Sequence, residues 1–274
     1  INRGNSGGPL FNMDGEVIGV NTAILSPNGG SIGIGFSMAS NVVTRVVNQL
    51  KEFGETRRGW LGVRIQDVTQ DVADAMGLAK ASGALITDVP DGPAKDAGLK
   101  TGDVILSFAG VEVEDTRGLV RQVGNSTVGA SVRVTVLREG KSQTLKVKLG
   151  RREDAEGAGA SASAPEDEAE PEAPASKSVL GLTITPLTDD LRTELGADDS
   201  VEGLAVTEVD EMSEAFEKGL RVGDIITEAG QQSILSITDL EDRITEAKDG
   251  GRKSLLLLVR RAGDPRFVAL GLGD

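Results

Sequence analysis

The 274-residue sequence contains no cysteine and no histidine, and only 3% of its residues are aromatic. Without cysteine the chain forms no disulfide and offers no thiolate to a metal ion. Without histidine these residues cannot assemble a complete Ser-His-Asp triad. We expect no cofactor and no metal site, and aliphatic side chains must build the hydrophobic cores because aromatic ones are scarce.

Basic residues are also outnumbered: 29 Lys and Arg stand against 43 Asp and Glu, which gives a net charge of −14. Such a charge disfavours generic binding to nucleic acid or to an anionic membrane surface. Long apolar runs are missing too, since the longest notable one, Leu255–Val259, has the length of a strand. We therefore expect no nucleic-acid partner and no membrane span in these residues.

A change of composition divides the chain between Arg151 and Ser178. This stretch is rich in Ala, Glu, Ser and Pro and has no large apolar side chain to bury. Such a sequence cannot offset the entropy lost on ordering. It predicts a flexible acidic linker, assigned to residues 153–178.

An internal repeat flanks this linker. AGLKTGDVI, which begins at Ala97, recurs as KGLRVGDII, which begins at Lys218, at an offset of 121 positions. Upstream, Leu61-Gly62-Val63 recurs as Leu180-Gly181-Leu182. Several matches at nearly one offset indicate a duplicated domain. We call residues 57–152 the first repeat and residues 179–274 the second repeat.

The sequence pattern of both repeats predicts the same small α+β domain. Each reads as a Leu-Gly segment leading into a strand, a short helix, a strand, the Gly-Asp turn, a strand, a helix and a terminal hairpin. Asp103 and Asp224 follow the Gly of that turn, and we expect them to cap it rather than to act in catalysis.

Residues 1–55 differ from the repeats. The stretch Asn12–Gly15 separates two apolar runs and predicts a hairpin, a further strand is expected over residues 32–38, and valines at helical spacing predict a helix capped by Ser40 or Asn41. Three strands and one helix leave open edges and an uncovered face. We therefore interpret residues 1–55 as the C-terminal portion of a longer domain.

The sharpest chemical signal is Gly4-Asn5-Ser6-Gly7-Gly8-Pro9. A nucleophilic serine needs a tight turn that presents its Oγ, with backbone N–H groups directed at the developing oxyanion. Glycines permit the backbone conformations of such a turn. The alternative is a Gly-rich turn with an incidental serine.

Residues 1–50, with GNSGGPL, DGEVIGVNTAI and GIGF, resemble the end of the protease domain of HtrA/Deg serine endoproteases. The resemblance implies part of a chymotrypsin-like β-barrel, with Ser6 as the nucleophile and the N–H groups of Gly4 and Ser6 as the oxyanion hole. It also implies that Ile34 and Phe36 border an apolar specificity pocket; the alternative for both is ordinary barrel core. Many relatives carry Pro where this chain has Arg3, which is expected to leave the Arg3–Gly4 peptide freer to flip.

The two repeats resemble PDZ domains, which bind a peptide C-terminus by adding it as a strand to a sheet edge. That resemblance places Leu61, Gly62 and Val63 in the carboxylate-binding loop of the first repeat, and Leu180, Gly181 and Leu182 in that of the second. Arg57 and Arg58 lie just upstream, either as a cation for the carboxylate or as a solvated hinge. The second repeat has no such cation, so we expect weaker binding there.

Together these resemblances imply a mostly β protein with α+β modules, part of an ATP-independent periplasmic protease of protein quality control. The expected partners are unfolded polypeptides and peptide C-termini, and the family builds homo-oligomers based on trimers. The alternative is a non-catalytic PDZ scaffold, because these residues hold only one member of a triad. The fragment alone is expected to be inactive.

Overall fold

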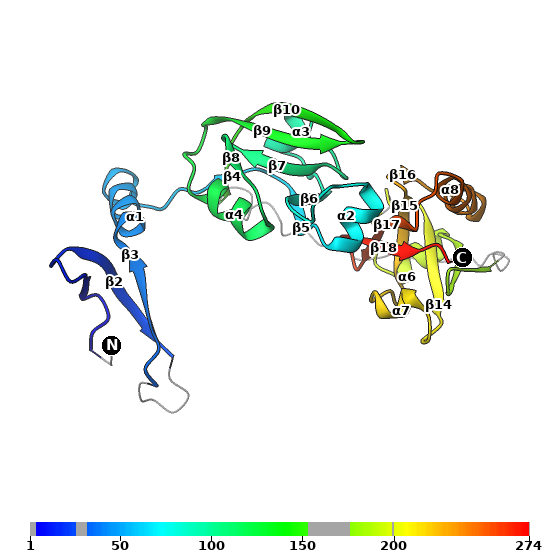
Figure 1. Ribbon diagram of the computed structural model, residues 1–274, viewed down its shortest axis with the longest axis horizontal. Coiled ribbons are helices and arrows are strands. Elements are labelled where there is room, and N and C mark those ends of the chain that lie inside the picture. Colours follow the sequence, from blue (N-terminus) through cyan, green and yellow to red (C-terminus); the bar gives the residue numbers. More distant parts are fainter. Residues whose placement is uncertain (1–3, 26–31, 153–175, 199, 274) are drawn as a thin grey trace. The chain divides into compact units, whose positions relative to one another are not determined.

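The computed structural model describes residues 4–25, 32–152, 176–198 and 200–273 (Figure 1). It comprises two compact units, Ile1–Arg57 and Arg58–Asp274, and the second unit contains both repeats apart from Arg57.

The first unit is an antiparallel sheet followed by one helix. Strands β1 (Pro9–Phe11), β2 (Val17–Ile24) and β3 (Gly35–Ala39) pair in that order, and α1 (Ser40–Phe53) follows directly. The hairpin and the helix agree with the sequence prediction. Among the described residues of this unit only Gly19 and Asn21 are buried, so it has no hydrophobic core of its own there.

The predicted cap of this helix is wrong. The N-cap residue is Ala39, because β3 runs into α1 without an intervening loop. Its methyl side chain cannot accept a hydrogen bond from the first turn of the helix. Ser40 is already helical, and its carbonyl oxygen accepts a hydrogen bond of 2.9 Å from Thr44 Oγ1. At the other end Gly54 adopts a φ of 73°, and its N–H closes the last turn on the carbonyl of Leu50.

The first repeat forms one antiparallel sheet with three helices. The sheet order is β10-β9-β7-β6-β5, β8 pairs with β7, and the short β4 pairs with β11. The strands are β4 (Gly59–Trp60), β5 (Arg64–Asp67), β6 (Ala84–Asp88), β7 (Val104–Phe108), β8 (Val111–Glu112), β9 (Ser131–Arg138), β10 (Lys141–Lys148) and β11 (Gly150–Arg151), and the helices are α2 (Gln70–Met76), α3 (Pro93–Asp96) and α4 (Thr116–Gly124).

The second repeat follows the same plan with one difference at the sheet edge. Its order is β12-β13-β14-β15-β17-β18, with β16 on β15, so one more strand precedes the counterpart of β5. The strands are β12 (Lys177–Val179), β13 (Leu182–Pro186), β14 (Leu204–Val209), β15 (Ile225–Ala229), β16 (Gln232–Ser233), β17 (Ser254–Arg261) and β18 (Asp264–Gly271), and the helices are α6 (Asp189–Glu194), α7 (Glu214–Glu217) and α8 (Ile237–Asp249).

The predicted linker falls mainly on residues 153–175, which lie outside the described residues. Its predicted end needs correction, because Lys177 and Ser178 belong to β12. Two adjacent apolar residues, Val179 and Leu180, pack against the core of the second repeat and hold this short strand in place.

Each repeat has a separate aliphatic core, as the scarcity of aromatic residues predicts. Phe108 is the one aromatic side chain in the core of the first repeat, among Val, Leu, Ile and Ala. A third cluster joins the repeats through Val72, Leu85, Val104, Leu256, Leu258 and Phe267. Beside it the Gln66 side chain accepts a hydrogen bond of 2.7 Å from the Phe267 N–H and donates one of 3.2 Å to its carbonyl.

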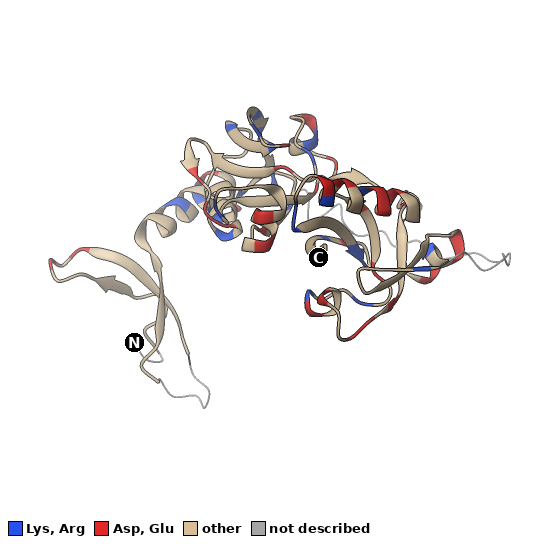
Figure 2. Cartoon of the chain, turned by 45° about the vertical axis from the view of Figure 1, so that its right-hand side comes forward, with Lys and Arg blue, Asp and Glu red and all other residues tan. Residues whose placement is uncertain are grey.

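Charged residues are spread over the helices and turns, and the helices of the second repeat carry mainly Asp and Glu (Figure 2). Among the residues that the structure describes, no helix is both long and apolar enough to cross a bilayer. The described part also contains no group of three or more Asp and Glu side chains placed to hold a metal ion.

Candidate catalytic serine and peptide-binding grooves

Ser6 lies in the turn that leads into β1. Its Oγ is 3.3 Å from the carbonyl oxygen of Thr22 on β2, to which it donates a hydrogen bond, and the residue is exposed. A main-chain carbonyl cannot take up the hydroxyl proton in the way a general base does. Among the described residues the Ser6 hydroxyl thus bonds to a main-chain carbonyl and not to a general base.

Glycines shape this turn. Gly4 and Gly7 adopt φ values of 95° and 84°, which glycine reaches without strain. The N–H of Gly7 donates to the Asn21 carbonyl at 2.8 Å, and that of Gly8 to the Asn5 carbonyl at 3.0 Å. The first bond ties the turn to β2, and the second closes the turn on itself, so both N–H groups already have a main-chain partner.

The two residues expected at the specificity pocket, Ile34 and Phe36, lie in and just before β3. Their exposed fractions are 47% and 54%, so neither is buried in a core in this structure. Arg3, where many relatives carry Pro, lies outside the described residues.

A groove of about 450 Å³ lies beside the edge strand β5 of the first repeat. Leu61, Gly62 and Val63, which were predicted from sequence, line it as the loop between β4 and β5. The opposite wall comes from α4. The lining is Gly59, Trp60, Leu61, Gly62, Val63, Arg64, Ile65, Pro90, Leu119, Val120, Val123, Gly124 and Arg152.

Trp60 holds this loop in shape. A Cβ on Gly92 would lie 2.8 Å from the indole, and one on Gly62 would lie 3.4 Å from it, so both glycines allow close approach to the ring. Gly62 also has a φ of 82°, which favours glycine at the centre of the loop. The single tryptophan of the chain therefore packs directly against the predicted carboxylate-binding loop.

The cations of the groove differ from those that the sequence predicts. Arg57 stacks on Phe53 at 3.9 Å and pairs with Glu55, and the Arg58 carbonyl accepts a hydrogen bond from the Arg152 N–H. Both arginines are described, and neither lines the groove.

Arg64 and Arg152 line the groove instead, and Arg64 forms an ion pair of 2.8 Å with Asp264. Sequence reasoning passed over Arg152 because it lies about ninety positions downstream of the loop; only the pairing of β4 with β11 brings it there.

In the second repeat the predicted loop is a tight hairpin turn. Leu180 and Gly181 have φ values of 52° and 78° and connect β12 to β13. Both positive values match a two-residue type I′ turn. Leu182 is buried as the first residue of β13.

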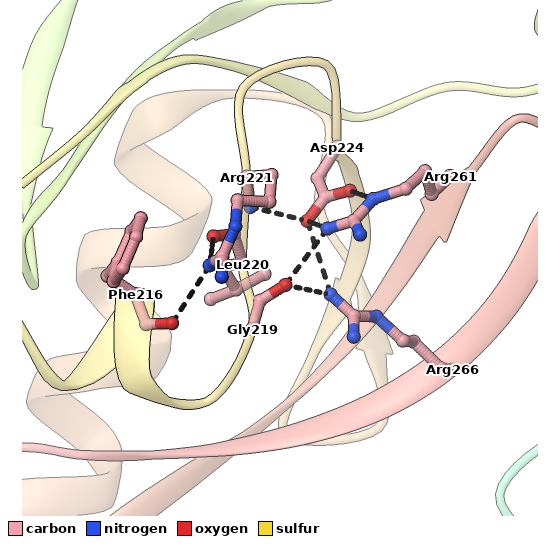
Figure 3. A network of polar contacts seen from close by, with 7 residues as sticks. All are labelled: Phe216, Gly219, Leu220, Arg221, Asp224, Arg261 and Arg266. Atoms are coloured by element: carbon pink, nitrogen blue, oxygen red, sulfur yellow. Dashed lines mark hydrogen bonds and ion pairs between the residues drawn. The ribbon is translucent and has the colours of Figure 1, made fainter. Parts of the chain in front are cut away.

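Asp103 and Asp224 are buried and structural, as expected from the Gly-Asp turn. Oδ2 of Asp224 accepts a hydrogen bond of 3.0 Å from the Arg221 N–H, and its two carboxylate oxygens accept bonds of 2.6 and 2.8 Å from Arg261 (Figure 3). Arg266 approaches the same carboxylate at 3.4 Å. The sequence motif indicated the turn but not these arginines, which come from the terminal hairpin.

This geometry agrees with the comparisons to known proteins. The PDZ domain family matches residues 30–149 and 178–270, and the Trypsin family matches residues 1–47. Sheet plan, groove and serine turn thus define a PDZ-containing protein of the serine endoprotease class.

Curated relatives show which serine endoproteases the chain is similar to. The chain is 43% identical over 98% of its length to a DegP-like periplasmic serine endoprotease of Bartonella henselae, of which it covers 51%. It is 40% identical over 98% of its length to one of Rhizobium meliloti, of which it covers 52%. A solved HtrA-type protease, a variant of AlgW with a decapeptide, shows 40% identity and a TM-score of 0.50, covering 56% of this chain and 46% of that one.

The chain belongs to the HtrA/DegP-like family of PDZ-containing serine endoproteases. The fold class and the periplasmic location expected from the resemblance agree with these findings. The chain spans about half the length of the curated relatives it matches.

Proposed function

We propose that this chain supplies the nucleophile and the peptide-binding domains of an ATP-independent serine endoprotease, which cleaves unfolded polypeptides in the periplasm as part of protein quality control. Ser6 would attack the scissile carbonyl, and the N–H groups of Gly4 and Ser6 would stabilise the oxyanion. The exposed Ser6 turn and the names of the relatives support this proposal.

The general base would have to come from residues outside this sequence, because the chain contains no histidine. The 274-residue chain should therefore not hydrolyse casein at neutral pH. A longer form that contains a histidine and an aspartate should hydrolyse it and should lose this activity on Ser6→Ala. Turnover by the 274-residue chain that disappears on Ser6→Ala would show that the proposed mechanism is wrong.

Labelling by a fluorophosphonate separates the protease from a non-catalytic scaffold. In the longer form, an activated Ser6 should react rapidly, and Ser6→Ala should abolish the label. Absence of labelling there would favour the alternative, a scaffold whose serine is vestigial.

The first repeat is proposed to bind peptides that end in an apolar residue with a free carboxylate. The observation that carries this proposal is the apolar groove beside β5, a strand that ends its sheet among the described residues. The peptide would pair with that edge, and its last side chain would contact Val63, Ile65 and Leu119. The Gly62 loop would receive the carboxylate on backbone N–H groups, much as a nest does.

Trp60 provides the test, because the only tryptophan of the chain lines this groove. A peptide ending in valine should change Trp60 fluorescence in a saturable way. Its C-terminal amide should bind about tenfold more weakly, since it loses charge-assisted hydrogen bonds. Equal affinities for acid and amide would rule out carboxylate capture.

Two further points belong to this proposal. The chain would divide into a protease portion at 1–55, a first PDZ domain at 57–152, a linker that begins at 153 and ends before β12, and a second PDZ domain that includes β12. The whole protein would form a homo-oligomer based on trimers, which sedimentation of the longer form would test.

A further inference from the structure

The strand β12 occupies the sheet edge that a peptide would use in the second repeat. Lys177, Ser178 and Val179 pair antiparallel with Ile184, Thr183 and Leu182 of β13, respectively. On its other side β13 pairs with β14, so both edges of β13 are taken.

The equivalent segment of the first repeat takes a different course. Gly59 and Trp60 stand 119 positions before Ser178 and Val179, the same offset that relates the two Leu-Gly motifs. In the first repeat they pair with β11 at the end of the domain, and β5 remains an edge strand among the described residues. The same position in the repeat thus leaves one groove open and covers the edge of the other.

Side chains of β12 also contact α8 and the core of the second repeat. The offset of 121 positions places Glu241 of α8 where the first repeat has Val120, a groove residue of α4. Lys177 Nζ lies 2.6 Å from Glu241 Oε1, so β12 contacts the helix wall as well as β13. Val179 packs against the core cluster that contains Leu182 and Leu240.

The direction of β12 is that of a bound peptide. It runs antiparallel to β13 and ends, at the apolar residue Val179, beside the Leu180-Gly181 turn. A peptide C-terminus bound by edge addition has the same polarity, with its last side chain at the loop. Here the chain continues through the turn instead of ending in a carboxylate.

We infer that the strand Lys177–Val179 is an intramolecular ligand of the second repeat, which fills its peptide groove and keeps it closed to other peptides. The inference rests on the proposed peptide binding by PDZ grooves. A tethered ligand acts at an effective concentration in the millimolar range and so outcompetes free peptides of ordinary affinity. Peptide capture then belongs to the first repeat, and the second binds only after β12 is displaced.

Disulfide trapping tests the position of β12, and the cysteine-free chain gives a clean background. In Ser178→Cys/Thr183→Cys the two residues lie directly opposite, at a Cα separation of about 5 Å that a disulfide can bridge. The control Ser178→Cys/Glu208→Cys places the second cysteine one strand further away, at about 10 Å, because Glu208 pairs with the far side of Thr183. Mild oxidation should close the first pair nearly completely and leave the control reduced. Equal closure, or closure of neither, would overturn the inference.

Photo-crosslinking tests the closure itself in the full 274-residue chain. The probe is a decapeptide that ends in valine with a free carboxylate and carries a benzophenone, and mass spectrometry locates the label. In the unaltered chain the label should appear on β5 and α4. In Lys177→Glu/Ser178→Pro, charge repulsion from Glu241 and a proline in the strand should release β12, and labelling of β13 and α8 should rise at least about tenfold.

Two controls make the result decisive. Lys146→Glu, an exposed lysine on β10, changes the same charge away from both grooves and should leave the pattern unchanged. A second opening variant, with glycine at positions 177–179, covers the case that proline prevents folding. Equal labelling of both repeats in the unaltered chain, or no gain in either opening variant while the first repeat is labelled, would overturn the inference. Absence of label from the first repeat as well would overturn the proposed peptide binding.

Discussion

At the scale of single residues, the two repeats place the same ion pair under the Gly-Asp turn. In the first repeat Arg138 donates two hydrogen bonds of 2.7 Å to Asp103 and one of 2.8 Å to the Gly98 carbonyl. Asp103 is fully buried, and its hydrogen bonds raise the pKa of Arg138 above the usual range. The guanidinium thus ties the terminal hairpin to the turn.

Replacing Arg138 by methionine should destabilise the first repeat by about 3–5 kcal/mol, because it leaves the Asp103 carboxylate buried without its partner. Urea unfolding followed through Trp60 measures this effect in the repeat concerned. Arg133→Met on the same strand is the control, since Arg133 is exposed. Similar losses for both variants would contradict this role of Arg138.

Arg152 is the residue with the clearest expected effect on peptide affinity. It lines the groove, and its backbone N–H is held by the Arg58 carbonyl at 3.0 Å. Arg152→Gln should weaken binding of a peptide acid several-fold, since an exposed charge pair contributes up to about 1 kcal/mol. Binding of the peptide amide should change little, and Arg57→Gln should leave both affinities unchanged. An equal loss for acid and amide would assign Arg152 a packing role instead.

At the scale of elements, α8 contacts β12 through the Lys177–Glu241 ion pair and begins with a capping box. Ser236 Oγ accepts a hydrogen bond of 3.2 Å from the Asp239 N–H, and Asp239 Oδ2 accepts bonds of 2.8 and 2.9 Å from the N–H groups of Ser236 and Leu235. The bonds from Leu235 and Ser236 lower the pKa of the Asp239 carboxyl. The box fixes the start of the helix that carries Glu241.

Because the pKa of Asp239 is lowered in the folded state, we expect the free energy of unfolding to fall in acid. A carboxyl whose pKa is lower in the folded state stabilises the fold above its unfolded pKa, near pH 4, and loses this contribution as pH falls through the folded value. Unfolding midpoints should therefore fall more steeply below pH 4 in the unaltered chain than in Asp239→Asn. Parallel pH profiles would contradict this role.

Ser236→Ala should lower the free energy of unfolding by about 1 kcal/mol at pH 7, where Asp239 stays ionised.

At the scale of the whole molecule, the second unit is held together by a cluster that neither repeat forms alone. Leu256, Leu258 and Phe267 of the second repeat pack with Val72 and Leu85 of the first. Val72 lies on α2, and the other four lie on strands, on the sheet face that does not cover the core of their own repeat. The repeats are therefore expected to stabilise each other.

Gln66→Ala should weaken this coupling, because the Phe267 N–H and carbonyl both lose their side-chain partner. The expected loss is about 1–3 kcal/mol for polar groups left unsatisfied next to a buried cluster. Hydrogen exchange of the Phe267 amide should accelerate accordingly, while that of Val136, in the core of the first repeat, should change less. Unchanged protection of Phe267 would show that the side chain contributes nothing to the contact.

The sequence by itself determined the local features of this protein. The glycine turn around Ser6, the duplicated Gly-Asp turn and the hairpin turn at Asn12–Gly15 contain glycines in backbone conformations that few other residues adopt, so a short motif is enough to predict them. The composition also predicted the aliphatic cores. Because the chain has no histidine, composition alone excluded a complete triad within these residues.

Tertiary structure decided which distant residues meet. Arg152 enters the groove only because β11 pairs with β4, and Arg138 reaches Asp103 only because the terminal hairpin folds over the turn. The sequence also did not predict the partner of each edge strand. The corresponding strands β4 and β12 pair with β11 in the first repeat and with β13 in the second, respectively. Short strands have no strong local preference for a partner, so the surrounding packing makes that choice.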